Sequence, residues 1–124
     1  METLEVGSAL VALCREGKYL EAIDTYYADD IVSIEGATQG DQPARLEGVA
    51  AIRGKNEWWE ANHEVHEVTV EGPFCAEGYD TFGLHFFLDI TPKGGERLKM
   101  SEVALYRVSG GKIVEERFLY NMAG

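Results

Sequence analysis

The sequence predicts a single α+β domain spanning residues 1–124, with three N-terminal helices packed on a curved antiparallel or mixed β-sheet. Apolar residues recur at helical spacing in the first half of the chain, whereas from His63 onward strand-like segments are separated by Gly and Pro. A length of 124 residues with 45% hydrophobic content suits one domain with its own core and is too short for two.

Two helices are predicted at the N-terminus, where apolar residues recur three and four positions apart. In the first helix these residues are Val6, Leu10, Leu13 and Cys14, and in the second they are Leu20, Ile23 and Tyr27. Glu16-Gly17 interrupts the pattern between the two sets, so we expect a helical hairpin.

A short strand, a loop and a third helix are expected next. The β-branched run Ile31–Glu35 predicts the strand, and the segment Gly36–Gly48, rich in turn residues, predicts the loop. From Val49 the apolar spacing predicts a helix that continues past Gly54 and ends near Asn62.

The rest of the chain is predicted to form a meander of antiparallel strands. Turn residues separate four segments, which are residues 63–71, 79–91, 98–108 and 112–120. A three-residue turn at Ser109-Gly110-Gly111 would set three pairs opposite one another: Ala104 and Glu116, Glu102 and Phe118, and Met100 and Tyr120. A two-residue turn would shift this register by one residue and turn the last strand over.

Glu102 is a carboxylate in the middle of an apolar strand segment. Because side chains alternate along a strand, Glu102 shares a face with Met100, Ala104 and Tyr106. An ionised carboxylate is unfavourable in apolar surroundings, so such a group gains either a raised pKa or a partner. A carboxyl with a raised pKa is suited to general acid–base catalysis near neutral pH.

Each acidic candidate also has a structural interpretation. Glu102 could pair with a neighbouring basic residue such as Arg107, or it could face water or a subunit interface. Glu35 could be a loop carboxylate at the edge of the sheet. Glu116, which lies between Glu115 and Arg117, could belong to a solvated run of charges.

Three segments of the sequence carry a family resemblance. In chain order they are YYADDIVSIEG, GVAAIRGKNEWWEAN and SEVALYRVSGGKIVEERFLYN. They resemble landmarks of the SnoaL-like family of the NTF2-like superfamily, which also contains ketosteroid isomerases, limonene-epoxide hydrolases and scytalone dehydratase. The resemblance implies a cone-shaped, cystatin-like fold, in which the sheet wraps the long helix around a central pocket, and a homodimer through the outer face of the sheet. It says less about the reaction, because one scaffold carries many chemistries.

The resemblance also bears on individual residues. It aligns Glu35 with, or very near, the catalytic base of ketosteroid isomerases. The tyrosine and the protonated aspartate of those enzymes fall close to Leu10 and Ala104, so ketosteroid isomerisation itself is not expected. The Asp-Arg-Asp set of limonene-epoxide hydrolases cannot be assembled from this sequence. The alignment implies that the strand face bearing Glu102 looks into the pocket.

The candidate catalytic residues are therefore Glu102, Glu35, Tyr120 and His66, of which His66 could assist acid–base chemistry. Tyr120 and Tyr106 carry hydroxyls that could polarise a carbonyl group. The candidate ligand-binding residues are Tyr27, Trp58, Trp59, Phe82, Phe86, Met100, Tyr106, Glu116 and Phe118. On a strand, His63 and His66 of the HEVHEV segment point to opposite faces, so no metal site is expected.

The residues and the resemblance together favour a cofactor-independent acid–base enzyme of the isomerase, cyclase or dehydratase type, acting on an apolar carbonyl or polycyclic compound. The alternative is a non-catalytic ligand-binding or dimerisation module of the same superfamily. Such a module would lack a deep cavity, or its Glu102 would be exposed or ion-paired. No nucleotide cofactor is expected, because the sequence has no P-loop and no GxGxxG motif.

The chain is strongly acidic, with 22 Asp and Glu against 11 Lys and Arg and a formal net charge of −11. This charge repels a phosphate backbone, so nucleic acid is not expected as a partner. No membrane association is expected either, because no apolar run is long enough to cross a bilayer. With only two cysteines and no basic targeting region at the N-terminus, the chain is predicted to be a reduced, cytoplasmic protein.

Overall fold

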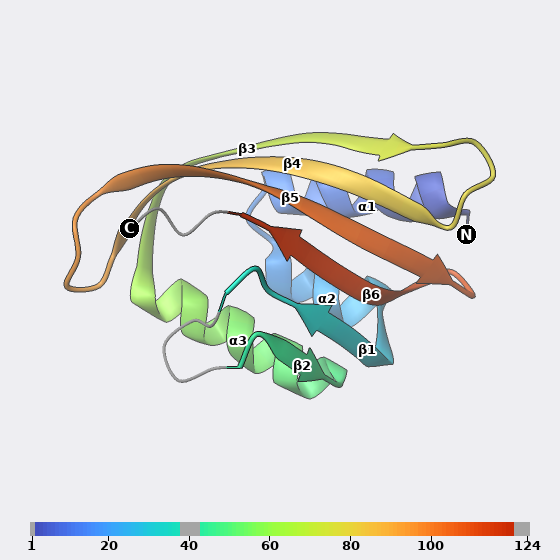
Figure 1. Ribbon diagram of the computed structural model, residues 1–124, viewed down its shortest axis with the longest axis horizontal. Helices are drawn as coiled ribbons and strands as arrows, with labels where there is room; N and C mark the ends of the chain where they lie inside the picture. The colour runs from blue at the N-terminus through green and yellow to red at the C-terminus, as the bar shows by residue number, and fades with distance from the viewer. Residues whose placement is uncertain (1, 38–42, 121–124) are drawn as a thin grey trace.

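In a computed structural model, which describes residues 2–37 and 43–120, helices pack on one side of a single mixed sheet (Figure 1). The elements are α1 (Thr3–Arg15), α2 (Tyr19–Tyr26), β1 (Tyr27–Ile34), β2 (Arg45–Glu47), α3 (Val49–Asn62), β3 (His63–Cys75), β4 (Thr81–Pro92), β5 (Leu98–Ser109) and β6 (Lys112–Leu119). The sheet order is β2-β1-β6-β5-β4-β3, and the β1–β6 pair is parallel. The predicted α+β class is confirmed. None of the helices in the described residues is long and apolar enough to cross a membrane.

Two details of the N-terminal half differ from the sequence prediction. Tyr27, expected on the second helix, is instead the first residue of β1, with an extended backbone at φ −88° and ψ 137°. The predicted loop 36–48 contains the strand β2, whose Leu46 pairs with Ser33 of β1. Three residues with one apolar side chain are too short to give a strand pattern, so this strand depends on pairing with β1. Residues 38–42 of the predicted loop lie outside the described part of the chain.

The hairpin between β5 and β6 differs from the prediction in its register, but the residues of β6 predicted to face inward do so. A two-residue turn, Gly110-Gly111 with φ of 60° and 78°, replaces the expected three-residue turn. A bulge at Val114 then adds one residue to β6, so that Ala104 pairs with Phe118 and Tyr106 pairs with Glu116. The predicted partners were wrong by two residues, yet beyond the bulge Glu116 and Phe118 still face inward, as predicted.

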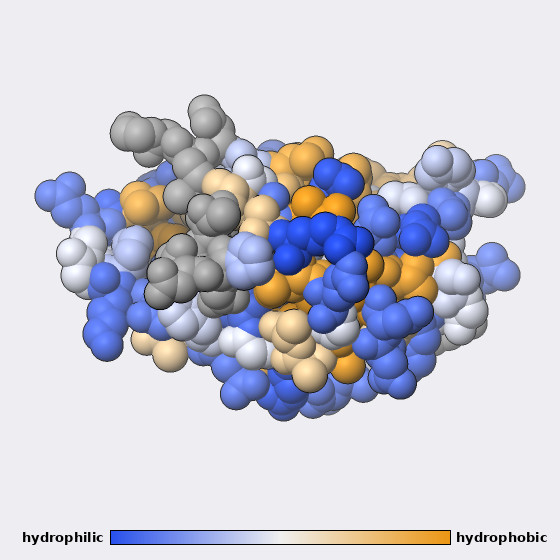
Figure 2. Space-filling view, turned by 60° about the horizontal axis from the view of Figure 1, so that its bottom comes forward, coloured by the Kyte–Doolittle hydropathy of each residue, from blue (hydrophilic) through white to orange (hydrophobic). Residues whose placement is uncertain are grey.

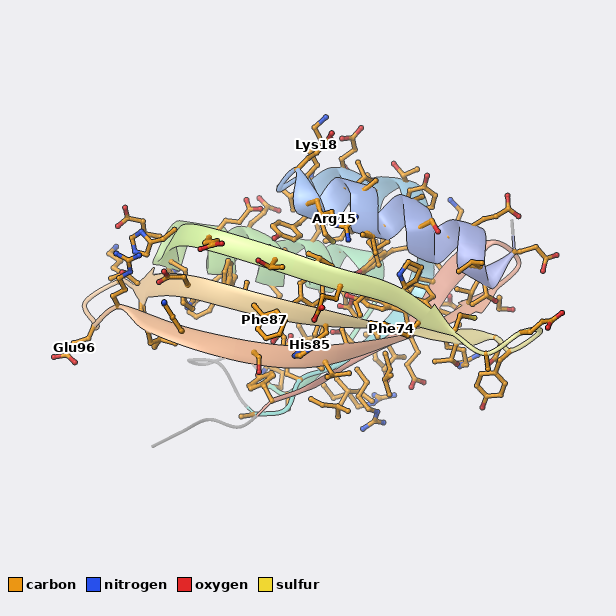
Figure 3. All side chains as sticks on the ribbon, turned by 90° about the horizontal axis from the view of Figure 1, so that it is seen from above. Arg15, Lys18, Phe74, His85, Phe87 and Glu96 are labelled. Atoms are coloured by element: carbon orange, nitrogen blue, oxygen red, sulfur yellow. The ribbon has the colours of Figure 1, made fainter. Side chains whose placement is uncertain are left out.

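The inner face of the sheet and the helices enclose the core. Phe82, Leu84 and Phe86 of β4 alternate with residues on the opposite face and are all buried. Helix α1 packs across β3 and β4 so closely that a Cβ on Gly7 would lie 2.9 Å from Pro73 Cβ. Seen from above in Figure 3, the blue helices α1 and α2 lie on one side of these strands.

The outer face of the sheet carries exposed apolar side chains. Phe87, Val103, Leu105 and Leu119 lie next to one another on β4, β5 and β6. His85 lies among them and faces away from the core, as its alternation with Leu84 and Phe86 predicts. On the side of the molecule shown in Figure 2, hydrophobic surface is likewise exposed between hydrophilic residues. Homodimerisation through the outer face of the sheet stays a prediction.

The close approach of α1 gives a test with a matched pair of glycines. Gly7→Ala is expected to lower the free energy of unfolding by about 1–3 kcal/mol, because the added methyl group overlaps the rigid ring of Pro73. Gly54→Ala in α3 meets no atom within 4 Å and is expected to raise it by about 0.5–1 kcal/mol through helix propensity. Chemical denaturation measures both values, and stabilisation by Gly7→Ala would contradict this packing.

Candidate active site

A cavity of about 890 Å³ lies between the inner face of the sheet and the three helices. Ten of the residues singled out from the sequence line it: Tyr27, Glu35, Trp59, Phe86, Met100, Glu102, Tyr106, Glu116, Phe118 and Tyr120. Its deep end is formed by buried residues such as Leu10, Ile23 and Tyr106. Its rim includes the exposed residues Leu98 and Lys99.

Three other candidates do not line this cavity. Trp58 is 36% exposed, because neighbouring positions on a helix point about 100° apart and only Trp59 faces the sheet. Phe82 is stacked on Tyr106 in the core, with ring centroids 5.0 Å apart. His66 falls at an irregularity in the pairing of β3 with β4 and is exposed, with its Nε2 2.7 Å from Thr91 Oγ1. The structure therefore gives these three side chains no contact with a ligand in the cavity.

A buried lysine, Lys55 of α3, stands at the centre of the polar groups. Its ammonium donates hydrogen bonds to Glu35 Oε1 at 2.7 Å and to Ser33 Oγ at 2.8 Å. It also lies 3.7 Å from Glu116 Oε1 and 5.1 Å from the centre of the Phe118 ring. Lys55 thus connects α3 to the end of β1 and to β6 through hydrogen bonds and ion pairs.

Lys55 is not among the site residues predicted from the sequence, although its position on the helix indicates a buried role. Lys55 follows the buried Ile52 by three positions and precedes Trp59 by four, so all three share one helix face. A lysine on the apolar face of a helix indicates a buried acidic partner. Ser33, the other residue missed, alternates correctly with Ile31 on β1, but a serine alone predicts no role.

Glu116 is almost completely buried, at 1% exposure, and both of its oxygens are hydrogen-bonded. Ser33 Oγ donates to Oε1 at 2.8 Å, and the Tyr27 hydroxyl donates to Oε2. Burial raises the pKa of Glu116, against the opposing effects of Lys55 and of the two hydrogen bonds. The interpretation of Glu116 as part of a solvated charge run is therefore wrong, because the bulge at Val114 turns it inward.

Glu35 also lies inside the cone and not in a solvated loop. Its side chain is 10% exposed, and it accepts a hydrogen bond from the Tyr120 hydroxyl at 3.1 Å in addition to the one from Lys55. Tyr120 thereby connects the end of β6 to the end of β1. Both groups are thus held at the same side of the cavity.

Glu102 has a different environment from these two carboxylates. No hydrogen bond or ion pair joins its carboxylate to any other residue in the ranges 2–37 and 43–120. Arg107, the suggested partner, lies instead 3.7 Å from Glu115. Burial raises the pKa of Glu102 from 4.5 to about 7, with the charge of Glu35 adding to the rise and Lys55 opposing it. This carboxyl group is therefore available to a ligand and changes protonation near neutral pH.

The cysteine of the cavity is not a nucleophile. Cys14 is buried at the deep end, and burial raises the pKa of its thiol to about 12. The thiolate form needed for attack is therefore scarce at neutral pH. The chemistry available in this cavity is proton transfer by carboxyl groups, with Lys55 as the nearby positive charge.

The comparisons with known proteins agree with this architecture. The model of a family described as the SnoaL-like domain matches residues 1–120. No curated protein sequence matches the chain. Among solved structures, the chain is similar to a candidate SnoaL-like polyketide cyclase from Mesorhizobium loti. The two share 45% identity over 97% of this chain and 100% of that one, with a TM-score of 0.88.

Two more distant structures contain small molecules. A Mycobacterium tuberculosis protein in complex with estradiol-17β-hemisuccinate is 21% identical over 98% of this chain and 96% of that one, with a TM-score of 0.75. A Catenulispora acidiphila protein with a ketosteroid isomerase-like fold, in complex with trimethylamine, is 24% identical over 97% and 88%, with a TM-score of 0.74. These two likenesses concern the fold alone, and they confirm the architecture that the sequence resemblance implies.

Removal of Lys55 is expected to destabilise the protein strongly. In Lys55→Met, Glu35 and Glu116 lose the buried positive charge between them, so the free energy of unfolding at pH 8 should fall by about 3 kcal/mol. The loss should be smaller at pH 5.5, because Lys55 lowers the pKa of Glu116 and its removal favours the neutral acid. Denaturant unfolding at both pH values measures this. Arg53→Met, which breaks only exposed ion pairs, is the control and should have an effect below about 1 kcal/mol.

Glu102 is expected to make stability depend on pH. Its pKa of about 7 in the folded protein lies above the ordinary 4.5, so the folded state binds more protons and stability falls as pH rises between these values. Glu102→Gln should therefore be close to wild type at pH 4.5 and more stable by up to about 3 kcal/mol at pH 8. Unfolding titrations across this range provide the measurement, with Glu96→Gln at an exposed position as the control. A difference that does not change with pH would contradict the raised pKa.

Proposed function

The chain belongs to the SnoaL-like domain family, as its sequence landmarks predict, and on this basis we propose that it is a cofactor-independent acid–base enzyme. The reaction is an isomerisation, cyclisation or dehydration of an apolar carbonyl or polycyclic compound. The observation that carries this proposal is the carboxyl of Glu102, which lines the cavity without a hydrogen-bonded partner in the described residues and has a pKa of about 7.

Glu102 is the proposed general base. At neutral pH a group with this pKa is present both as carboxylate and as acid. The carboxylate removes a proton from a carbon next to a carbonyl group, and the acid formed returns this proton to a second carbon or to a leaving hydroxyl group. Both steps use one residue, so no cofactor is needed.

Glu35 and Lys55 set the charge around this base. Glu35 is proposed to act as a positioning residue, because its carboxylate is held by Lys55 and Tyr120 and raises the pKa of Glu102 from nearby. Lys55 brings a positive charge to the wall of the cavity, where it stabilises negative charge that develops on the substrate. In this arrangement Tyr120 does not act on the substrate itself but holds the carboxylate of Glu35 through its hydrogen bond.

The apolar nature of the substrate follows from the cavity wall. The residues that line the cavity include Phe86, which pairs with Glu102 in the sheet, and the apolar Leu88, Ile90, Met100 and Phe118. A volume of about 890 Å³ is in the range of pockets that bind drug-sized molecules. The steroid derivative bound by the Mycobacterium tuberculosis protein of similar fold supports a polycyclic ligand here.

Exchange of α-protons in a model ketone tests the proposal directly. 2-Tetralone, a bicyclic ketone, should exchange hydrogen for deuterium faster in the presence of the protein, as followed by NMR in D₂O. The rate should rise with pH through about 7 and then level off, because the base is the ionised form of Glu102. Glu102→Gln should reduce the protein-dependent rate at least about 100-fold.

Glu35→Gln separates a positioning role from that of the base. Since the charge of Glu35 raises the pKa of Glu102, this variant should keep exchange activity but shift its pH midpoint below 7. Glu96→Gln, at the exposed tip between β4 and β5, should leave rate and midpoint unchanged. Binding of 2-tetralone without any acceleration of exchange would favour the non-catalytic binding module, and an unimpaired Glu102→Gln would exclude Glu102 as the base.

A further inference from the structure

The hydroxyl of Tyr106 is a buried polar group without a partner in the protein. Tyr106 is 3% exposed and lines the deep end of the cavity, yet its hydroxyl makes no hydrogen bond to any residue that the structure describes. Among those residues, every completely enclosed side-chain nitrogen or oxygen has a partner. The Tyr106 hydroxyl must therefore reach open space, and on the inner face of β5 that space is the cavity.

Two other tyrosines that line the cavity near the acidic groups are already engaged. Tyr27 donates to Glu116, and Tyr120 donates to Glu35. Tyr106 keeps its proton, because burial and then the charge of Glu116 raise its pKa well above the ordinary value. It is therefore a hydrogen-bond donor whose proton has no protein acceptor in the described residues.

The ring that carries this hydroxyl is held in place. It stacks on Phe82 at 5.0 Å between ring centroids, and it meets Phe118 edge to face at 6.3 Å. An unpaired hydroxyl in such surroundings is unfavourable until an acceptor reaches it. Because the aromatic packing fixes its direction, an acceptor must approach from within the cavity.

Strand β5 gives the order of the groups from rim to deep end. Lys99 is exposed at the rim, Glu102 follows, and Tyr106 lies four residues further in. At about 3.3 Å per residue, the Cα atoms of Glu102 and Tyr106 are roughly 13 Å apart. A ligand that reaches the Tyr106 hydroxyl from the rim must extend past Glu102.

We propose that the Tyr106 hydroxyl donates a hydrogen bond to an oxygen at the leading end of the ligand. The cavity then takes elongated, apolar compounds that carry a carbonyl or hydroxyl oxygen at the end that enters first. Tyr106 is thus a residue that determines specificity and orientation, while Glu102 acts further along the same molecule. This inference rests on the proposed function of the cavity.

Two probes of nearly equal shape test this inference. 2-Acetylnaphthalene carries a ketone oxygen at one end, and 2-isopropylnaphthalene has the same outline without it. Tyr106→Phe should weaken binding of the ketone about five- to tenfold, as expected for one lost hydrogen bond. Its affinity for the hydrocarbon should change less than about twofold. Equilibrium dialysis measures all four dissociation constants, and Tyr79→Phe, at an exposed position, is the control.

The outcomes separate this inference from the proposed function. Equal effects of Tyr106→Phe on the two probes, or no effect on either, would overturn the role of Tyr106. With Glu102-dependent exchange of 2-tetralone intact, such a result would leave the proposed function standing. If neither probe binds to the wild-type protein while Glu102-dependent exchange of 2-tetralone persists, this inference alone is overturned. If that exchange is absent as well, the proposed function fails, and this inference fails with it.

Thermal unfolding provides an independent readout of the unpaired hydroxyl. Tyr106→Phe should leave the melting temperature unchanged or raise it, because the lost hydroxyl has no described partner. Tyr27→Phe removes a hydroxyl that donates to Glu116 and should lower the melting temperature. A similar loss in both variants would mean that the Tyr106 hydroxyl has a structural partner, and it would overturn the inference.

Discussion

The buried ammonium of Lys55 joins three elements that are distant in the sequence. It pairs with Glu35 at the end of β1, contacts Ser33 on the same strand and lies close to Glu116 on β6. Strands β1 and β6 are the parallel pair of the sheet, and α3 packs against β1. In a buried site of low dielectric constant, the ammonium is stable only beside the two carboxyl groups, and their ionised forms are stable only beside the ammonium. The position of α3, and with it one wall of the cavity, depends on this arrangement.

Burial, and after it the charges of the same cluster, account for the reactivity proposed for Glu102. One ammonium faces three carboxyl groups, and two of these, Glu35 and Glu116, are hydrogen-bonded by nearby groups. Glu102 is the third, and it has no direct partner of its own among the described residues. Burial raises its pKa most, and the repulsion from Glu35 and Glu116 adds to the rise. Its proton is therefore held up to neutral pH. The unfavourable environment of the Glu102 carboxylate thus gives this group the raised pKa that acid–base chemistry requires.

The turn between β5 and β6 decides which side chains reach the cavity. A two-residue Gly-Gly turn by itself would have turned β6 over, so that Glu116 and Phe118 faced outward. The bulge at Val114 compensates with one extra residue and restores the inward face. Glu116 thereby reaches Tyr27, and Phe118 reaches Tyr106. One extra residue in the strand thus connects the hairpin to the polar cluster and to the aromatic wall.

The order and type of the main elements could be predicted from the sequence, because helical spacing and strand alternation are local properties of the chain. The sequence also indicated the shared face of Met100, Glu102 and Tyr106, and it contains the SnoaL-like landmarks. The partners of the polar groups, such as those of Lys55, became evident only in the folded protein. The same holds for the inward position of Glu116 and for the positions of Trp58, Phe82 and His66 outside the cavity wall. The strand β2 and the start of β1 at Tyr27 were likewise decided by pairing. Burial and hydrogen bonding depend on residues that folding brings together from different elements, and a local sequence pattern contains no information about such contacts.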